Sequence, residues 1–170
     1  FCIRNTAPDM AVCDRYYYVS DREALDAFIK GRRASGQIEK DDGSIVQAGS
    51  TGGRNAITML IRNLVWNSMR WAGKPFYQWV KDFSPELILL QAGDCAFMMD
   101  LARKLAKKYR IPLVIYNSEA YYFKKFDYFR SSGIKRLFYP LFHHQFCRAF
   151  QKCVRVANRS IYCCDKLKED

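Results

Sequence analysis

The sequence lacks both a long hydrophobic run and a cysteine framework. Its strongest continuous apolar run, Leu87–Leu90, is the size of a β-strand, whereas a helix that crosses a membrane needs about 20 apolar residues. The seven cysteines are odd in number and form no CxxC pair. This argues against a secreted disulfide scaffold and favours small buried thiols in a reducing compartment, Cys163 and Cys164 included. No internal repeat or low-complexity tract is present, which excludes a solenoid.

What is present is the composition of a globular domain. The 170 residues are 49% hydrophobic, 26% charged and 15% aromatic. A chain of this length buries roughly 70% of the surface that its unfolded form exposes, so it can build a core without disulfides. We therefore expect residues 1–170 to form a single domain.

Acidic residues are scarce in the last 70 positions. Residues 1–100 hold 12 basic and 12 acidic residues, whereas residues 101–170 hold 16 basic and five acidic ones, which accounts for the whole net charge of +11. A basic region of this kind attracts polyanions such as anionic lipid, nucleic acid or a diphosphate. The alternative is a solvated basic face without a partner.

The first half of the chain carries weaker patterns. Short runs at residues 1–4 and 15–19 are typical of strands, and Ser20 with Glu23 has capping-box spacing that predicts a helix through Lys30. Residues 31–53 are rich in Gly, Ser and charge and predict a loop. Apolar residues at helical spacing predict helices over 54–71 and 75–83.

The second half predicts an α/β fold. A continuous apolar strand at residues 85–90, a polar loop at 91–94, a helix ending near Tyr109 and a second apolar strand at 113–116 form a βαβ unit with parallel strands. Continuous rather than alternating apolar strands indicate that both faces of the sheet are covered. We therefore predict a Rossmann-like, doubly wound, mostly parallel sheet with helices on both faces.

A third unit follows with the same order of elements. A long helix is predicted after the loop at 117–133, and Pro140 either kinks this helix or marks its first turn. A strand at 160–163 and a helix capped by Asp165 come next. The expected inward side chains of the long helix are Leu137, Phe138, Leu141, Phe142, Phe146, Ala149, Phe150 and Val154.

Polar residues gather where these strands end. Ligands of open α/β sheets bind at the carboxyl ends of the strands. That edge carries Gln91, Gly93 and Asp94 after one strand, and Asn117 and Glu119 after the next. We expect the functional site there.

Three segments at this edge carry a family resemblance. Residues 85–94 (PELILLQAGD), 107–119 (KKYRIPLVIYNSE) and 157–170 (ANRSIYCCDKLKED) resemble, in order and spacing, the acceptor-side Rossmann-like domain of GT-B glycosyltransferases. The family 4 type, which builds bacterial surface polysaccharides, is the most similar. Residues 1–84 resemble it poorly, and no counterpart of the family's first strand–helix unit precedes Phe1.

The resemblance implies a function and partners. The chain would be an acceptor-binding domain that lacks its first strand–helix unit and its C-terminal donor domain, and would be inactive alone. It would hold no cofactor, because the nucleotide-sugar donor would bind mainly the missing domain. The acceptor would be a glycan or a lipid-linked sugar at the cytoplasmic face of the plasma membrane. The alternative function is a non-catalytic basic α/β module that binds an anionic partner, either membrane lipid or nucleic acid, of which nucleic acid is less favoured.

Two carboxylates are the candidates for the chemistry. Sugar transfer needs a group that takes the proton of the acceptor hydroxyl, and Glu119 is the candidate catalytic carboxylate. Asp94, Asn117, Gln91 and Gly93 are the candidate acceptor-binding residues. The simpler alternative, favoured for Asp94, is that it N-caps the helix that begins at Cys95.

Two further motifs allow weaker interpretations. Gly52, Gly53 and Arg54 precede a helix and are a candidate phosphate-binding loop, with a flexible substrate-side loop as the alternative. His143 and Cys147 are four residues apart on a helix, but no second ligand pair is nearby, so we predict no metal site.

Basic and aromatic residues alternate in segment 121–150. This composition suits the headgroup region of an anionic membrane, and packing in a core or against a partner domain, or stacking on single-stranded nucleic acid, are the alternatives. The candidate patch for a membrane or anion comprises Lys107, Lys108, Lys124, Lys125, Lys135 and Arg136.

Overall fold

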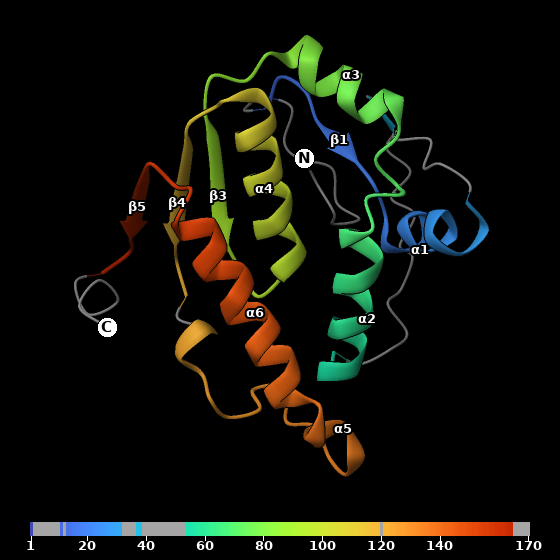
Figure 1. The fold of residues 1–170 in the computed structure, drawn as a ribbon, viewed down its shortest axis with the longest axis vertical. Coiled ribbons are helices and arrows are strands. Elements are labelled where there is room, and N and C mark those ends of the chain that lie inside the picture. Colours follow the sequence, from blue (N-terminus) through green and yellow to red (C-terminus); the bar gives the residue numbers. More distant parts are fainter. Residues whose placement is uncertain (2–10, 12, 32–36, 39–53, 120, 165–170) are drawn as a thin grey trace. The chain divides into compact units, whose positions relative to one another are not determined.

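The computed structural model describes residues 1, 11, 13–31, 37–38, 54–119 and 121–164 (Figure 1). The chain divides into two compact units: Phe1–Gly53 with Ser68–Ser84, and Arg54–Asn67 with Pro85–Asp170. We call them unit 1 and unit 2.

Unit 1 is a small helical unit with an aromatic core. Helix α1 (Asp21–Lys30) begins at the predicted capping box, in which Ser20 and Glu23 exchange hydrogen bonds, and ends at Gly31 with a left-handed backbone. Strands β1 (Tyr17–Tyr18) and β2 (Gln37–Ile38) pair antiparallel, so a short strand lies within the region predicted as a loop. Helix α3 (Lys74–Phe83) carries its proline in the first turn, and the packed rings are Tyr17, Trp71, Phe76 and Trp79.

Unit 2 contains the predicted parallel sheet. Strands β3 (Ile88–Ala92), β4 (Leu113–Asn117) and β5 (Arg159–Tyr162) lie in the order β3-β4-β5, and both pairs are parallel. Helix α4 (Ala96–Tyr109) connects β3 to β4. The connection from β4 to β5 holds the 3-10 turn η1 (Tyr121–Phe123), α5 (Ile134–Leu137) and α6 (Tyr139–Val154). The α/β class with a parallel sheet packed by helices is confirmed.

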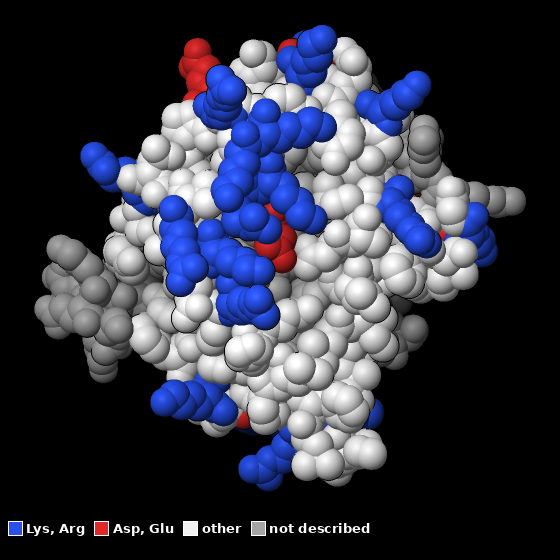
Figure 2. Space-filling view, viewed as in Figure 1, with Lys and Arg blue, Asp and Glu red and all other residues white. Residues whose placement is uncertain are grey.

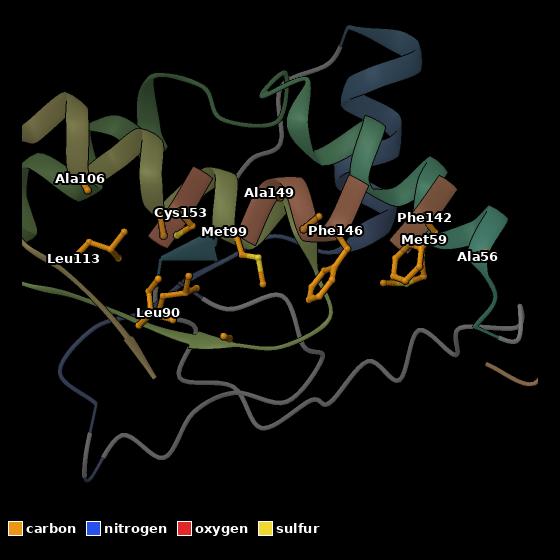
Figure 3. Close-up of a cluster of buried hydrophobic side chains, with 14 of the residues drawn as sticks. Ala56, Met59, Leu90, Met99, Ala106, Leu113, Phe142, Phe146, Ala149 and Cys153 are labelled. Carbon is orange, nitrogen blue, oxygen red and sulfur yellow. The ribbon is translucent and has the colours of Figure 1, made fainter. Parts of the chain in front are cut away.

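The core of unit 2 lies between one face of the sheet and the helices α4, α6 and α2 (Ala56–Asn67) (Figure 3). Its members alternate along the strands and recur at helical spacing on the helices. They include Met59, Leu90, Met99, Leu113, Ile115, Phe142, Phe146, Ala149 and Cys153. On the other face of β3, Leu89 is 63% exposed, so no helix of unit 2 within the described residues covers that side chain.

Several details differ from the sequence-based expectations. Helix α2 stops at Asn67, and Met69 two residues later has a left-handed backbone that ends helical geometry before Trp71. Pro140 lies in the first turn of α6, where its missing N–H costs no hydrogen bond, so the first-turn alternative is correct. The predicted strand at 1–4 and helix after Asp165 lie outside the described residues, apart from Phe1.

Some side chains predicted to be buried are exposed. Leu137 and Leu141 are 76% and 57% exposed, because they lie on a different side of the helical segment from Phe142 and Phe146. Cys163 and Cys164 are also exposed, so the expectation that they fill a core is wrong. Within the described part of the chain, every helix is too short or too polar to cross a membrane.

Candidate functional site

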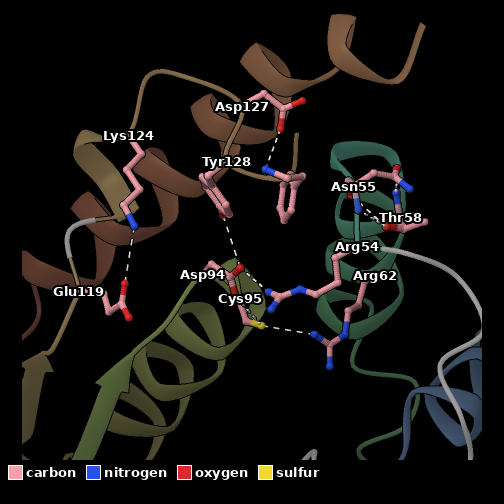
Figure 4. Close-up of polar contacts among 11 residues, drawn as sticks. Arg54, Asn55, Thr58, Arg62, Asp94, Cys95, Glu119, Lys124, Asp127 and Tyr128 are labelled. Atoms are coloured by element: carbon pink, nitrogen blue, oxygen red, sulfur yellow. Dashed lines mark hydrogen bonds and ion pairs between the residues drawn. The ribbon is translucent and has the colours of Figure 1, made fainter. Parts of the chain in front are cut away.

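The carboxyl edge of the sheet in unit 2 brings together residues from three parts of the chain (Figure 4). Asp94 follows β3 by two residues, and Glu119 follows β4 by two residues. Arg54 lies two residues before α2, and Tyr128 lies between η1 and α5. Because β3 and β4 are parallel neighbours, their ends meet at the same edge.

Asp94 is a nearly buried carboxylate surrounded by donors. Its side chain is 10% exposed and forms an ion pair with Arg54, whose side chain is 60% exposed. The hydroxyl of Tyr128 donates to Oδ2 at 3.5 Å, and the thiol of Cys95 lies 3.7 Å from Oδ1. The N-cap of α4 is Cys95, and no side chain caps the helix. The N-cap interpretation of Asp94 is therefore wrong, because its carboxylate is used by Arg54.

The charge of Asp94 changes the acidity of its neighbours. Burial opposes the charged form of Arg54, but the hydrogen bond and charge of Asp94 outweigh it and raise the pKa of the guanidinium. Burial, followed by the Asp94 charge, raises the pKa of Tyr128. Burial raises the pKa of Cys95 to about 11, although the guanidinium of Arg62, 3.3 Å away, lowers it in part. Cys95 is thus a protonated thiol at neutral pH, not a nucleophile.

Glu119 is the more accessible carboxylate of the edge. Its side chain is 51% exposed and lies 3.6 Å from Nζ of Lys124. The ammonium of Lys124 also lies 4.5 Å from the ring centre of Tyr121 and 5.8 Å from that of Tyr128. Burial and the charges of both Glu119 and Asp94 raise the pKa of Tyr121. The Tyr121 ring therefore lies within the field of both carboxylates.

The other predicted acceptor-binding residues have different environments. Asn117 is fully buried, and its amide Nδ2 donates to the carbonyl of Ile161 at 3.3 Å. Its backbone carbonyl accepts from the N–H of Cys163 at 3.2 Å, so Asn117 joins β4 to β5. Its Oδ1 has no hydrogen-bond partner among the described residues. Gly93 and Gln91 are exposed, and Gln91 alternates with the buried Leu90 and Ala92, which places it on the opposite face of β3.

The predicted loop and the predicted basic patch are only partly brought together. Gly52 and Gly53 lie outside the described residues, and Arg54 pairs with Asp94. Lys107 and Lys108 lie in the last turn of α4, at the amino edge of the sheet, because α4 runs antiparallel to the strands it connects. Lys124, Lys125, Lys135 and Arg136 lie in the segment that leaves the carboxyl end of β4.

A separate basic surface covers the helices. Figure 2 shows Lys and Arg side chains gathered over α4 and the C-terminal part of α6. The cations of these two segments are Arg103, Lys104, Lys107, Lys108, Arg148 and Lys152, and Arg155 follows α6. Asp100 pairs with Arg103 at 2.9 Å.

Sequence reasoning missed the contacts of Arg54 and the role of Tyr128. Arg54 is 40 residues from Asp94 and Tyr128 is 34 residues away, and nothing in the local pattern indicates a partner at that separation. His143 lies 3.2 Å from the carbonyl of Tyr122 and within 3.7 Å of the Cys147 sulfur. Among the described residues, no group of three His, Cys, Asp or Glu side chains is placed to hold a metal.

Comparison with known proteins identifies no family for this chain. No protein-family model matches it, and neither a curated protein nor a solved structure matches it. The resemblance to the acceptor side of GT-B glycosyltransferases therefore stays a prediction, and the arrangement of side chains at the carboxyl edge carries the functional argument.

Proposed function

We propose that the chain is the acceptor-binding part of a glycosyltransferase, which moves a sugar from a nucleotide-sugar donor to a glycan or lipid-linked acceptor. The observation that carries the proposal is the pair of unlike carboxylates at the carboxyl edge. Asp94 is nearly buried and neutralised by Arg54, while Glu119 is half exposed. The order and spacing of residues 85–94, 107–119 and 157–170 agree with this assignment.

The two carboxylates suit a polyhydroxylated ligand. A carboxylate open to solvent can accept a hydrogen bond from a sugar hydroxyl. Lys124, which pairs with Glu119, lies over the rings of Tyr121 and Tyr128, and these rings offer flat apolar faces with polar ends. The ion pair of Asp94 with Arg54 joins the turn between β3 and α4 to the residues that precede α2.

The proposed step is a displacement at the anomeric carbon. The acceptor oxygen forms a bond to that carbon while the bond from the carbon to the donor diphosphate breaks, and the diphosphate leaves with the bonding electron pair. The proton of the acceptor hydroxyl passes to Glu119 or to a phosphate oxygen of the donor. The donor itself would bind outside residues 1–170, so this chain needs no cofactor of its own.

Sugar transfer is the test of this proposal. The product of the complete reading frame that contains residues 1–170 is incubated with a panel of nucleotide sugars and a membrane lipid extract, and residues 1–170 alone serve as the comparison. We expect transfer by the first and none by the second. If no donor in the panel is transferred or hydrolysed, the proposal is refuted.

A second candidate function is supported by the basic surface over α4 and α6 (Figure 2). A non-catalytic module of this charge would bind a polyanion, and its affinity would fall as salt is added. Retention on immobilised heparin, with Lys107→Gln/Lys108→Gln as the variant, tests it. Strong retention that this variant weakens, together with absence of transfer, would favour the module.

A further inference from the structure

Exposed apolar side chains are concentrated in one segment of unit 2. Residues 123–141 hold six large hydrophobic side chains that are 39–76% exposed. We call these side chains the apolar surface: Phe123, Phe126, Ile134, Leu137, Phe138 and Leu141. Single exposed hydrophobic residues are ordinary, but a group of this size on one segment indicates an interaction site.

Four members of the apolar surface lie in α5 and at the start of α6. Ile134, Leu137, Phe138 and Leu141 have the i, i+3, i+4, i+7 spacing of an apolar helical stripe. Phe138 has a right-handed helical backbone and joins α5 to α6. This stripe is distinct from the buried side of α6, whose members Phe142 and Phe146 are at most 1% exposed.

The segment that carries the apolar surface is also rich in cations. Segment 123–141 contains five basic residues and one acidic residue. The acidic residue, Asp127, already accepts hydrogen bonds from the backbone N–H groups of Phe129 at 2.9 Å and Ser131 at 3.1 Å. The cations are Lys124, Lys125, Arg130, Lys135 and Arg136.

The segment is held in place by contacts behind it. The hydroxyl of Tyr139 donates to the carbonyl of Lys124 at 2.6 Å, which joins the start of α6 to η1. The ring of Tyr122 stacks on Phe150 with centres 4.4 Å apart. The apolar surface is thus presented by an ordered scaffold, which lowers the entropy lost on binding.

We propose that segment 123–141 is the surface by which this protein docks on an anionic lipid leaflet. Apolar side chains flanked by Lys and Arg match the acyl boundary and the negative headgroups of such a leaflet at the same time. The occupant is argued from this charge complementarity, since the cations outnumber the single carboxylate and that carboxylate is engaged by backbone groups.

The docking surface adjoins the candidate site. Lys124 lies 3.6 Å from Glu119, and Tyr128 hydrogen-bonds to Asp94 at 3.5 Å. A sugar carried on a lipid would therefore reach the carboxylates from the docked side. This statement about the acceptor rests on the proposed function, whereas membrane docking does not.

Vesicle binding tests the proposal without any sugar. Residues 1–170 are sedimented with neutral phosphatidylcholine vesicles and with vesicles that contain phosphatidylglycerol in addition. We expect binding to the mixed vesicles and much weaker binding to the neutral ones. Each Lys or Arg near such a surface contributes about fivefold to the affinity, so Lys135→Gln/Arg136→Gln should weaken binding by roughly 25-fold.

Matched variants separate this surface from the rest of the chain. Lys74→Gln/Lys81→Gln removes the same charge from two exposed positions of α3, a helix of unit 1, and should leave binding within about twofold. Ile134→Gln/Leu137→Gln should weaken binding by about tenfold or more, because each side chain loses apolar burial. Ile61→Gln/Leu64→Gln changes two comparably exposed residues of α2 and should have little effect.

The outcomes are unambiguous once each variant shows the circular dichroism of the parent. Equal binding to neutral and mixed vesicles would overturn the proposal. So would a loss of binding in the control variants as large as the loss in the variants of segment 123–141. If Lys135→Gln/Arg136→Gln abolishes vesicle binding but leaves the complete protein's sugar transfer to a water-soluble acceptor unchanged, the result would support docking. Vesicle binding by a protein that transfers no sugar would support docking and refute the proposed function.

Discussion

The ion pair between Arg54 and Asp94 leads to an asymmetric prediction. Asp94 is 10% exposed and Arg54 is 60% exposed. Arg54→Met leaves a nearly buried carboxylate whose hydrogen-bonding neighbours, among the described residues, are Tyr128 and Cys95. Asp94→Asn leaves a guanidinium that water can solvate, and the new amide oxygen still accepts hydrogen bonds. Loss of the exposed partner should therefore destabilise the protein more than neutralisation of the buried one.

The size of the effect follows from two limits. Exposed pairs contribute about 0.2–1 kcal/mol, and removal of one partner of a buried pair costs about 3–5 kcal/mol. One partner of this pair is nearly buried and the other is exposed. We therefore expect Arg54→Met to lower the free energy of unfolding by about 2 kcal/mol and Asp94→Asn to lower it by about 1 kcal/mol or less. The double variant should cost less than the sum of the two, because no unpaired carboxylate remains.

Urea unfolding followed by far-ultraviolet circular dichroism measures these free energies. The slope of the unfolding free energy against urea must match among the variants for the comparison to hold. The control is Lys30→Met, which breaks an exposed ion pair in which Nζ of Lys30 lies 2.9 Å from Oδ1 of Asp26. It should lower the free energy of unfolding by at most about 0.5 kcal/mol. A larger loss for Asp94→Asn than for Arg54→Met would refute the argument from burial.

Three further predictions concern packing and the thiols. Phe142→Ala should lower the free energy of unfolding in urea by about 3–5 kcal/mol. Leu137→Ala, at a 76% exposed site, should lower it by less than about 0.5 kcal/mol. Equal losses would contradict the assignment of Phe142 to the core and of Leu137 to the surface. Burial raises the pKa of Cys153 from 9.0 to about 11. The protonated thiol therefore contributes fully to the free energy of unfolding below pH 9, and this free energy declines by about 3 kcal/mol at most as the pH rises to 11. Unfolding curves that are equally pH-dependent in Cys153→Ala would exclude this. Brief alkylation mapped by mass spectrometry should label the exposed Cys163 and Cys164 well before Cys153, and early labelling of Cys153 would contradict its burial.

The sequence was sufficient to predict the elements around β3 and β4. Continuous apolar strands and polar turns are local signals there, as is the capping box at Ser20 that begins α1 in unit 1. Such elements can be predicted because nearby residues determine their backbone conformation. The parallel arrangement follows from the length of the connection between the strands, which is too long for a hairpin and holds a helix. Strand β2, with two residues, is too short to produce a pattern.

The side-chain contacts of the site could not be predicted in the same way. The partner of Asp94 is 40 residues distant, and its choice depends on where α2 packs. Periodicity showed that the segment from Leu137 to Val154 is amphipathic, but it merged two stripes. Only the packing of α6 on the sheet shows that Phe142 faces the core and that Leu137 does not.

The most direct test of the central claim is the acceptor dependence of sugar transfer by the complete protein with Glu119→Gln. Glu86→Gln makes the same change at an exposed position before β3, at the amino edge of the sheet, and serves as the control. We expect Glu119→Gln to lower kcat/KM for the acceptor at least tenfold, with no change in KM for the donor, and Glu86→Gln to match the parent. Equal kinetics for the two variants would remove the carboxyl edge from the acceptor site and contradict the account.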